Sequence, residues 1–201
     1  MGRVRSPVGN YLRSLAPCGR PYGAKTGIAQ QPYTTVDPVV IYLALGSNLG
    51  DRADNLRRAL KALRSQLVVE AVSPCYETEP VYVLDQPRFY NLACRASTPL
   101  TPLDLLHSLK DLETTLGREP GPRFGPRMID LDLLFYGDLI FESPELTIPH
   151  PRLHERPFVL VPLGDLAPDL VHPSLKLTIT ELRDRLGDVH SSIQRVENFK
   201  P

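Results

Sequence analysis

The chain has 201 residues, a length that suits one ordinary domain plus an appendage. Hydrophobic residues make up 42% of it and charged residues 23%, the proportions of average globular proteins, which argues against disorder throughout the chain. No apolar run approaches the roughly 20 residues of a membrane-spanning helix. The 23 basic residues balance the 23 acidic ones, which leaves no global field for nucleic acid or an anionic membrane. We therefore expect neither of these partners.

The three cysteines and the first 38 residues bear on location and domain organisation. Cys18, Cys75 and Cys94 lie far apart without a CxxC pattern, which argues against a disulfide framework or a zinc site and favours a reducing compartment, the cytoplasm. Residues 1–38 are basic, rich in Pro and Gly, and lack a hydrophobic period, which predicts a flexible extension. An organelle-targeting peptide is the alternative, although Pro and Gly would interrupt its helix. We assign residues 39–201 to the globular domain.

From Pro38 onward, apolar patterning predicts alternating strands and helices. Strands are expected at 39–45, 67–76, 89–97 and 128–136. One helix is expected from Asp51 or Arg52, and a second from Thr101-Pro102 to Gly117. The segment Glu77 to Arg88 is irregular, and one or two short helices follow a Pro-rich stretch near the C-terminus. The order strand, helix, strand, strand, helix, strand predicts an α+β fold, a ferredoxin-like sandwich with a mainly antiparallel sheet.

Two aspartates alternate with apolar residues in the last of these strands, Met-Ile-Asp-Leu-Asp-Leu-Leu-Phe-Tyr136. Side chains of a strand alternate between faces, so Asp130 and Asp132 share one face while Ile129, Leu131 and Leu133 share the other. Carboxylates about 7 Å apart on one strand suit a hard divalent cation. A half-solvated acidic face is the alternative, but Asp is disfavoured in strands.

Arginines and glycines surround this strand and suggest a phosphate site. Arg118, Arg123 and Arg127 lie just upstream, where guanidinium groups beside metal-binding carboxylates suit Mg²⁺-bound phosphates. A solvated basic loop is the alternative. Gly46-Ser-Asn-Leu-Gly50 is a second phosphate candidate, although a plain strand-to-helix connection explains it better. The segment Ile148 to Phe158 crowds histidines and arginines between prolines, which favours a loop that faces a ligand.

Four segments together resemble the 6-hydroxymethyl-7,8-dihydropterin pyrophosphokinase family (2-amino-4-hydroxy-6-hydroxymethyldihydropteridine diphosphokinases). They are YLALGSNLGDR, DQPRFYNLA, GPRMIDLDLLFYG and IPHPRLHERPFVLVPL. The resemblance spans Val39 to about Pro173, in the family's order and with its spacing. The resemblance implies a ferredoxin-like fold, a role in folate biosynthesis, and ATP with Mg²⁺, two ions, as requirements. It implies transfer of an intact diphosphate from ATP to the pterin hydroxymethyl group, with release of AMP. Its small-molecule partners are ATP and the hydroxymethyl dihydropterin.

The resemblance also implies roles for individual residues. Asp130 and Asp132 match the magnesium ligands, and with Arg118 and Arg127 at the triphosphate they form the expected catalytic set. The ATP-binding positions also include Leu133, Thr147, His150 and Arg156. The pterin-binding positions are Thr78, Val81, Phe89, Asn91, Phe124 and Phe158, of which Asn91 reads the ring edge and Phe89 and Phe158 sandwich the ring.

Three positions depart from the family pattern. Phe124 stands where the family usually has Trp, and Pro120 stands where many members have Arg. Glu79-Pro80-Val81 replaces a more usual Pro-Pro-Leu. Two rival hypotheses stay open: a different nucleotide-dependent transferase that shares the Asp pair, and a ferredoxin-like RNA-binding module. ATP turnover that depends on the pterin would distinguish the family's activity from the first hypothesis. The Asp pair argues against the second.

Overall fold

The computed structural model describes residues 37–122, 124–188 and 192–201. Residues 1–36, which hold nearly all of the expected extension, lie outside this part of the chain, as does Arg123. The strands are β1 (Val39–Ser47), β2 (Val68–Val72), β3 (Tyr76–Thr78), β4 (Phe89–Thr98), β5 (Asp130–Tyr136), β6 (Phe141–Glu142), β7 (Thr147–Ile148) and β8 (Ile193–Arg195). The helices are α1 (Arg52–Arg64), α2 (Pro102–Thr115), the 3₁₀ turn η1 (Leu153–Glu155), α3 (Pro157–Leu166) and α4 (Ile179–Asp184).

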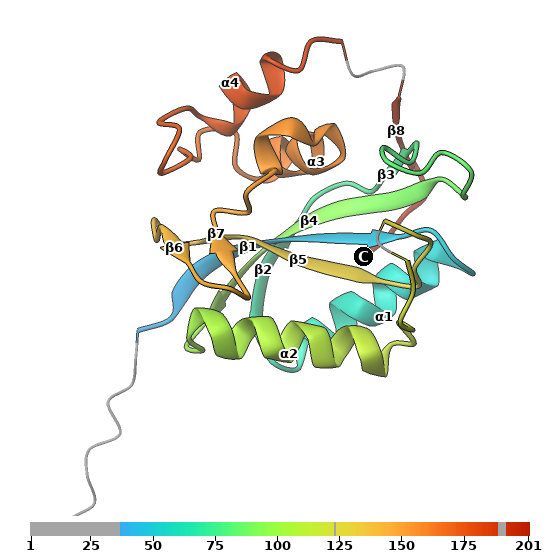
Figure 1. The fold of residues 1–201 in the computed structure, drawn as a ribbon, viewed down its shortest axis with the longest axis horizontal. Helices are drawn as coiled ribbons and strands as arrows, with labels where there is room; N and C mark the ends of the chain where they lie inside the picture. The colour runs from blue at the N-terminus through green and yellow to red at the C-terminus, as the bar shows by residue number, and fades with distance from the viewer. Residues whose placement is uncertain (1–36, 123, 189–191) are drawn as a thin grey trace, which may run out of the picture. The chain divides into compact units, whose positions relative to one another are not determined.

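The main sheet confirms the predicted α+β, ferredoxin-like arrangement. Its strand order is β5-β1-β4-β3-β8, with β2 also paired to β4, and every pairing is antiparallel. Helices α1 and α2 cover one face of this sheet, and α3 lies on the other face (Figure 1). Each of α1 and α2 begins at a side-chain cap, Asp51 and Thr101 respectively, as the capping rules lead us to expect.

The strand alternation of β1 divides the apolar residues into two cores. Ile41, Leu43 and Leu45 pack with the apolar stripes of α1 and α2. Tyr42 and Ala44 lie on the opposite face, where they contact the core beneath α3 and α4. Complete burial of one such leucine contributes about 2 kcal/mol. Both faces of the central strand are therefore covered, which explains its nearly continuous apolar sequence.

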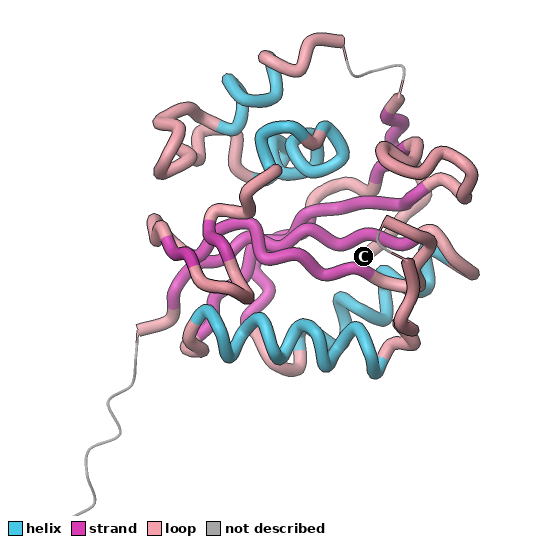
Figure 2. The backbone as a smooth tube through the Cα atoms, viewed as in Figure 1, coloured by secondary structure: helices cyan, strands magenta, loops and turns pink. Residues whose placement is uncertain are grey.

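Several boundaries differ from those predicted. The strand expected over 67–76 is two strands, β2 and β3. Between them the Ser73 amide donates to the Ala93 carbonyl, but the Ala93 amide donates to the Ser73 hydroxyl in place of a backbone carbonyl, which interrupts the regular ladder. Glu77 and Thr78, expected in an irregular segment, extend β3 instead. The hairpin of β6 and β7 and the edge strand β8 were not expected. These short strands appear in Figure 2 beside the longer central ones.

Candidate active site

A cavity of about 240 Å³ lies over the sheet on the face that α3 covers. Its floor comes from three neighbouring strands in register: Gly46 of β1 stands opposite Asn91 of β4 and opposite Asp130 of β5. Ala44, two residues earlier, pairs with Asp132. The small side chains of β1 thus leave an open space between an amide on one side and two carboxylates on the other.

Gly46 lets Asn91 reach its position in this floor. A Cβ atom at Gly46 would lie 2.8 Å from the Oδ1 atom of Asn91, which is closer than carbon and oxygen can approach. The amide is 7% exposed, and its Nδ2 atom donates to Thr78 Oγ1 at 2.7 Å. Asn91 is therefore held from β3 with its oxygen packed against bare backbone, and its orientation is fixed before any ligand arrives.

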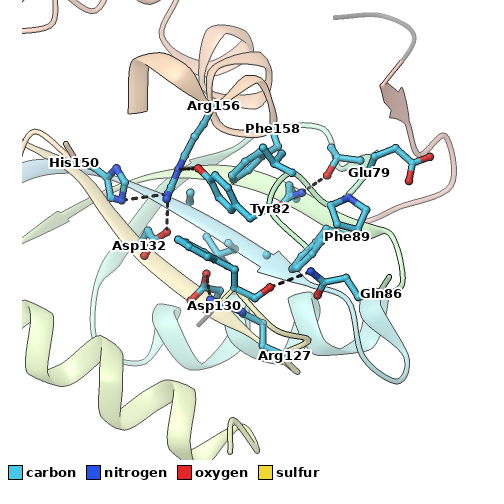
Figure 3. A pocket seen from close by; sticks show the side chains of 18 of the residues that line it. Glu79, Tyr82, Gln86, Phe89, Arg127, Asp130, Asp132, His150, Arg156 and Phe158 are labelled. Atoms are coloured by element: carbon cyan, nitrogen blue, oxygen red, sulfur yellow. Dashed lines mark hydrogen bonds and ion pairs between the residues drawn. The ribbon is translucent and has the colours of Figure 1, made fainter. Parts of the chain in front are cut away.

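The predicted alternation of β5 is confirmed. Asp130 and Asp132 both line the cavity, whereas Ile129, Leu131 and Leu133 are buried in the core beneath the sheet. Figure 3 shows the two aspartates on the strand next to Arg127 and Arg156. These carboxylates point into an open cavity that arginines also line, which argues against the alternative of a plain solvated acidic face.

Each carboxylate pairs with an arginine of the site. Asp130 accepts from Arg118 Nη1 at 2.5 Å and from Arg127 Nη1 at 2.9 Å. Asp132 Oδ2 lies 3.7 Å from Arg156 Nη1. The three arginines come from the loop after α2, the loop before β5 and the N-cap of α3, so these segments meet at the carboxylate pair.

The pKa values of the two carboxylates are shifted in opposite directions. Burial raises the pKa of Asp130, but the charges of Arg127 and Arg118 outweigh it and leave that pKa below its ordinary value. Burial, followed by the charge of Asp130, raises the pKa of Asp132 to about 6. A divalent cation between them would favour the ionised form of both.

The donor set of this pair fits Mg²⁺, which prefers hard oxygen ligands. Within the described ranges, however, no group of three or more His, Cys, Asp or Glu side chains is placed to hold a metal. Mg²⁺ usually keeps one or two carboxylates and completes its shell with water and substrate phosphate. Asp130 and Asp132 are therefore suited to hold the ion together with a phosphorylated ligand and not as a closed protein cage.

The aromatic side of the cavity contains Phe89 and Phe158 together with Asn91. Thr78, Val81 and Phe124 also line it, so the structure brings all six predicted pterin-site residues to one cavity. On the other side, His150 and Arg156 line the cavity with the carboxylates. Leu133 and Thr147 are not among the lining residues, and their proximity to a nucleoside stays a prediction.

His150 is neutral in this environment. Burial, followed by the charge of Arg156, lowers its pKa to about 4. Its Nε2 atom lies 3.2 Å from Arg156 Nη1, a donor, so in this contact the imidazole nitrogen acts as the acceptor. The pair Arg156 and His150 thus presents one cation and one uncharged ring to the cavity.

Comparisons with known proteins place this chain in a family. Residues 42–168 match the family model of 7,8-dihydro-6-hydroxymethylpterin-pyrophosphokinase. A 2-amino-4-hydroxy-6-hydroxymethyldihydropteridine pyrophosphokinase of Pseudomonas aeruginosa is 44% identical over 66% of this chain and 83% of its own length. The Haemophilus influenzae protein of the same name is 41% identical over 75% of this chain and 94% of its own. The chain belongs to this pyrophosphokinase family.

Other relatives within the family are much longer. The "Folate synthesis bifunctional protein, mitochondrial" of Pisum sativum is 53% identical over 78% of this chain, and the match covers 30% of the pea protein. This chain therefore spans less than a third of that relative. A Plasmodium falciparum HPPK-DHPS structure covers 81% of this chain and 50% of its own, with a TM-score of 0.67 at 18% identity, and so supports the fold alone.

The positions that depart from the family pattern keep structural roles. Glu79 is exposed, lines the cavity and forms an ion pair with Arg88. Phe124 stacks on Tyr82 with ring centroids 4.3 Å apart. Its φ of 62° is in the left-handed region, which is uncommon for a residue with a side chain and costs of order 1 kcal/mol. Pro120 is exposed and lines no part of the cavity.

The turn Gly46 to Gly50 connects the loops around the cavity. Asn48 is 2% exposed; its Oδ1 accepts from Arg127 N at 2.7 Å, and its Nδ2 donates to Gln86 Oε1 at 3.0 Å. Gln86 in turn donates to the carbonyl oxygen of Phe124 at 3.0 Å. The polar groups of Asn48 therefore bind protein atoms, which favours the interpretation of this turn as a connection over that of a phosphate site.

Sequence reasoning missed a buried glutamate next to the arginines. Glu113 of α2 is 2% exposed; it accepts from the amide of Leu131 at 2.6 Å and forms ion pairs with Arg118 at 2.6 Å and Lys110 at 3.1 Å. It also missed Lys110, Tyr82 and Gln86, which line the cavity. A glutamate within the apolar stripe of a helix was the one signal available for Glu113.

Proposed function

We propose that this chain transfers diphosphate from ATP to the hydroxymethyl group of 6-hydroxymethyl-7,8-dihydropterin, a step of folate (tetrahydrofolate) biosynthesis. One observation carries the proposal: a single cavity holds a carboxylate pair with arginines on one side and a fixed amide with two phenylalanines on the other. A charged polyphosphate suits the first side, and a flat hydrogen-bonding ring suits the second. The acceptor and donor substrates would meet over Ala44 and Gly46.

The reaction exchanges one phosphorus–oxygen bond for another. The hydroxymethyl oxygen forms a bond to the β-phosphorus of ATP, and the bond from that phosphorus to the oxygen that bridges to the α-phosphorus breaks. AMP leaves with the electron pair, and the hydroxyl proton passes to solvent. The protein's part is to hold the oxygen about 3 to 3.5 Å from the phosphorus and in line with the leaving oxygen.

Asp130 and Asp132 would hold Mg²⁺, as two ions. When bound, the ions supply charge neutralisation at the phosphate oxygens. Arg118 and Arg127 would bind the triphosphate, since their planar guanidinium forks match phosphate oxygens. Both arginines pair with Asp130 through Nη1, and a guanidinium group has further N–H donors that would bind the phosphate oxygens.

The nucleoside and pterin ends would be bound by uncharged and aromatic groups. His150 and Arg156 would hold the nucleotide, with Leu133 and Thr147 near the nucleoside. Asn91 would donate to and accept from the pyrimidine edge of the pterin. Phe89 and Phe158 would stack on its faces, and the backbone near Thr78 and Val81, with Phe124 from the facing loop, would close the ring's surroundings.

Phosphorus NMR of one turnover tests the reaction. The full chain is incubated with ATP, Mg²⁺ and the hydroxymethyl dihydropterin, and we expect AMP and a diphosphorylated pterin in equal amounts. ADP with a monophosphorylated pterin would overturn the diphosphate transfer. ATP turnover that does not depend on the pterin would instead favour a different nucleotide-dependent transferase.

The compartment and further partners are predictions from the sequence. We propose a cytoplasmic location with small-molecule substrates and no nucleic-acid or membrane partner. No helix in the described part of the chain is long and apolar enough to cross a bilayer. Since the pea relative is named mitochondrial, fractionation of cells that express the full chain is the direct test, and recovery with mitochondria would contradict the proposal.

A further inference from the structure

Tyr82 occupies the junction of three segments around the cavity. It belongs to the loop between β3 and β4, where Val81 and Leu84 are 50% and 76% exposed, yet its own side chain turns inward and lines the cavity. Its ring stacks on Phe124, which belongs to the loop before β5, with centroids 4.3 Å apart and planes inclined by 34°. Its hydroxyl oxygen accepts from Arg156 Nε at 3.3 Å.

The contact between Tyr82 and Arg156 fixes a side chain that faces the nucleotide half of the cavity. The Arg156 side chain is 12% exposed, so its donors need protein partners. Nε is directed at Tyr82, while Nη1 lies 3.2 Å from His150 and 3.7 Å from Asp132. Figure 3 shows these three connections radiating from one guanidinium group. A planar fork held at two edges has one orientation.

A second cation strengthens the position of the ring. The guanidinium carbon of Arg152 lies 4.8 Å from the centroid of Tyr82, within the range of a cation–π contact. The ring thus contacts both Phe124 and Arg152, while its hydroxyl accepts from Arg156. Phe124 keeps an unfavourable backbone φ of 62° at this contact, as is common where surrounding contacts over-determine a functional loop.

We propose that Tyr82 is a positioning residue that joins the two halves of the site: its hydroxyl orients Arg156 for the nucleotide, and its ring holds the two loops that enclose the pterin. The proposal rests on the function proposed above, because it assigns Arg156 to the nucleotide and the loops to the pterin. It predicts that the two contacts are separable, since the hydroxyl serves one ligand and the ring serves the other.

Calorimetry on the full chain separates these contacts. The probes are α,β-methylene-ATP with Mg²⁺ and, separately, 6-hydroxymethylpterin. Tyr82→Phe removes the hydroxyl and keeps the ring, so the Kd of the ATP analogue should rise about three- to tenfold, the effect of one ordinary hydrogen bond. The Kd of the pterin should change less than twofold. Tyr82→Leu should weaken the pterin as well, by about three- to tenfold, because the stack on Phe124 is lost.

Two further variants test whether the effect passes through Arg156. In an Arg156→Lys background, which lacks Nε as a donor, Tyr82→Phe should cause no additional loss of analogue affinity. Tyr90→Phe is the matched control: Tyr90 lies close by in β4 beneath Arg52 but does not line the cavity, and its variant should bind both probes as the native chain does. A structural role alone would move the melting temperature and both affinities together.

The outcomes are distinguishable from failure of the proposed function. If the native chain binds the analogue but no pterin, the proposed function is wrong, and the analogue titration of Tyr82→Phe still decides the link to Arg156. If Tyr82→Phe binds the analogue like the native chain, or loses the same factor in the Arg156→Lys background, Tyr82 does not position Arg156. If Tyr82→Leu leaves pterin affinity unchanged, the ring does not hold the loops.

Discussion

Replacement of Glu113 by alanine should destabilise the fold more than any exposed substitution on the same helix. The carboxylate is 2% exposed and accepts from the buried amide of Leu131 at 2.6 Å, so its removal leaves that donor without its partner. A buried unsatisfied donor costs about 1–3 kcal/mol. Glu113 therefore couples α2 to β5, because its carboxylate accepts from the backbone amide of Leu131 near the start of that strand.

The charge of Glu113 adds a smaller contribution. Arg118 and Lys110, its ion-pair partners, are 28% and 46% exposed, so water still solvates them after the change. We take about 1 kcal/mol for both pairs because solvent screens them. The expected loss for Glu113→Ala is then about 2–4 kcal/mol, and for Glu113→Gln, which keeps an acceptor for Leu131, about 1 kcal/mol.

Urea unfolding followed by circular dichroism measures these losses as shifts of the midpoint at constant slope. Asp111→Asn is the matched control, since Asp111 is an exposed acidic residue two positions away on α2. The free energy of unfolding of this control should stay within about 0.5 kcal/mol of the native value. Equal stabilities of Glu113→Ala and Asp111→Asn would refute the argument, because they would show that the Leu131 amide finds another acceptor.

Three further predictions concern the site itself. Asp132→Asn should reduce turnover at least about 100-fold with folding retained, because it removes an anionic ligand at nearly constant shape; near-normal activity at limiting Mg²⁺ would remove Asp132 from the metal site. Phe158→Ala should weaken pterin binding by roughly 1–3 kcal/mol through lost stacking and apolar contact, and calorimetry that finds the ATP analogue affected instead would contradict the assignment. His150→Gln should flatten the decline of melting temperature between about pH 6.5 and pH 4. The pKa of His150 is lowered to about 4 in the folded state, whereas an unfolded histidine titrates near 6.5. Its contribution to stability is therefore complete above pH 6.5, where both states are neutral. It is lost on acidification, because the unfolded state takes up a proton that the folded state does not bind until about pH 4. An unchanged slope would show that His150 does not contribute.

The parts of the site that follow a strand period were predictable from sequence. Asp130 and Asp132 had to share a face once Ile129, Leu131 and Leu133 were assigned to the core, because alternation is a local property of the backbone. The same holds for the central strands, whose apolar runs need burial on both faces. The resemblance to the family added site residues from other segments of the chain, because the periodicity of a single strand or helix cannot show which distant segments meet.

The unpredicted parts depend on partners that come from distant segments. The burial of Glu113 follows from the arrival of the Leu131 amide and of Arg118, neither of which a helical pattern reveals. Tyr82 sits in a loop of exposed apolar residues, and its inward position depends on contacts with Phe124, Arg152 and Arg156 from distant segments. The edge strand β8 contains one buried apolar residue, Ile193, which is too weak a pattern to distinguish a strand from a loop.

The last prediction concerns Gly46 and its register partner Asn91. In Gly46→Ala the new methyl group would lie 2.8 Å from Asn91 Oδ1, so the amide must rotate or withdraw from Thr78. We expect pterin affinity to fall at least tenfold, since a displaced amide no longer matches the ring edge, while affinity for the ATP analogue changes less than threefold. The mechanism is tested by a double-mutant cycle, because Asn91→Ala also removes the atom with which the methyl clashes. Pterin affinity of the double variant should equal that of Asn91→Ala alone. Additive losses would mean that the methyl group blocks the pterin directly, and the role of Gly46 would then be to provide space for the ligand instead of for the amide.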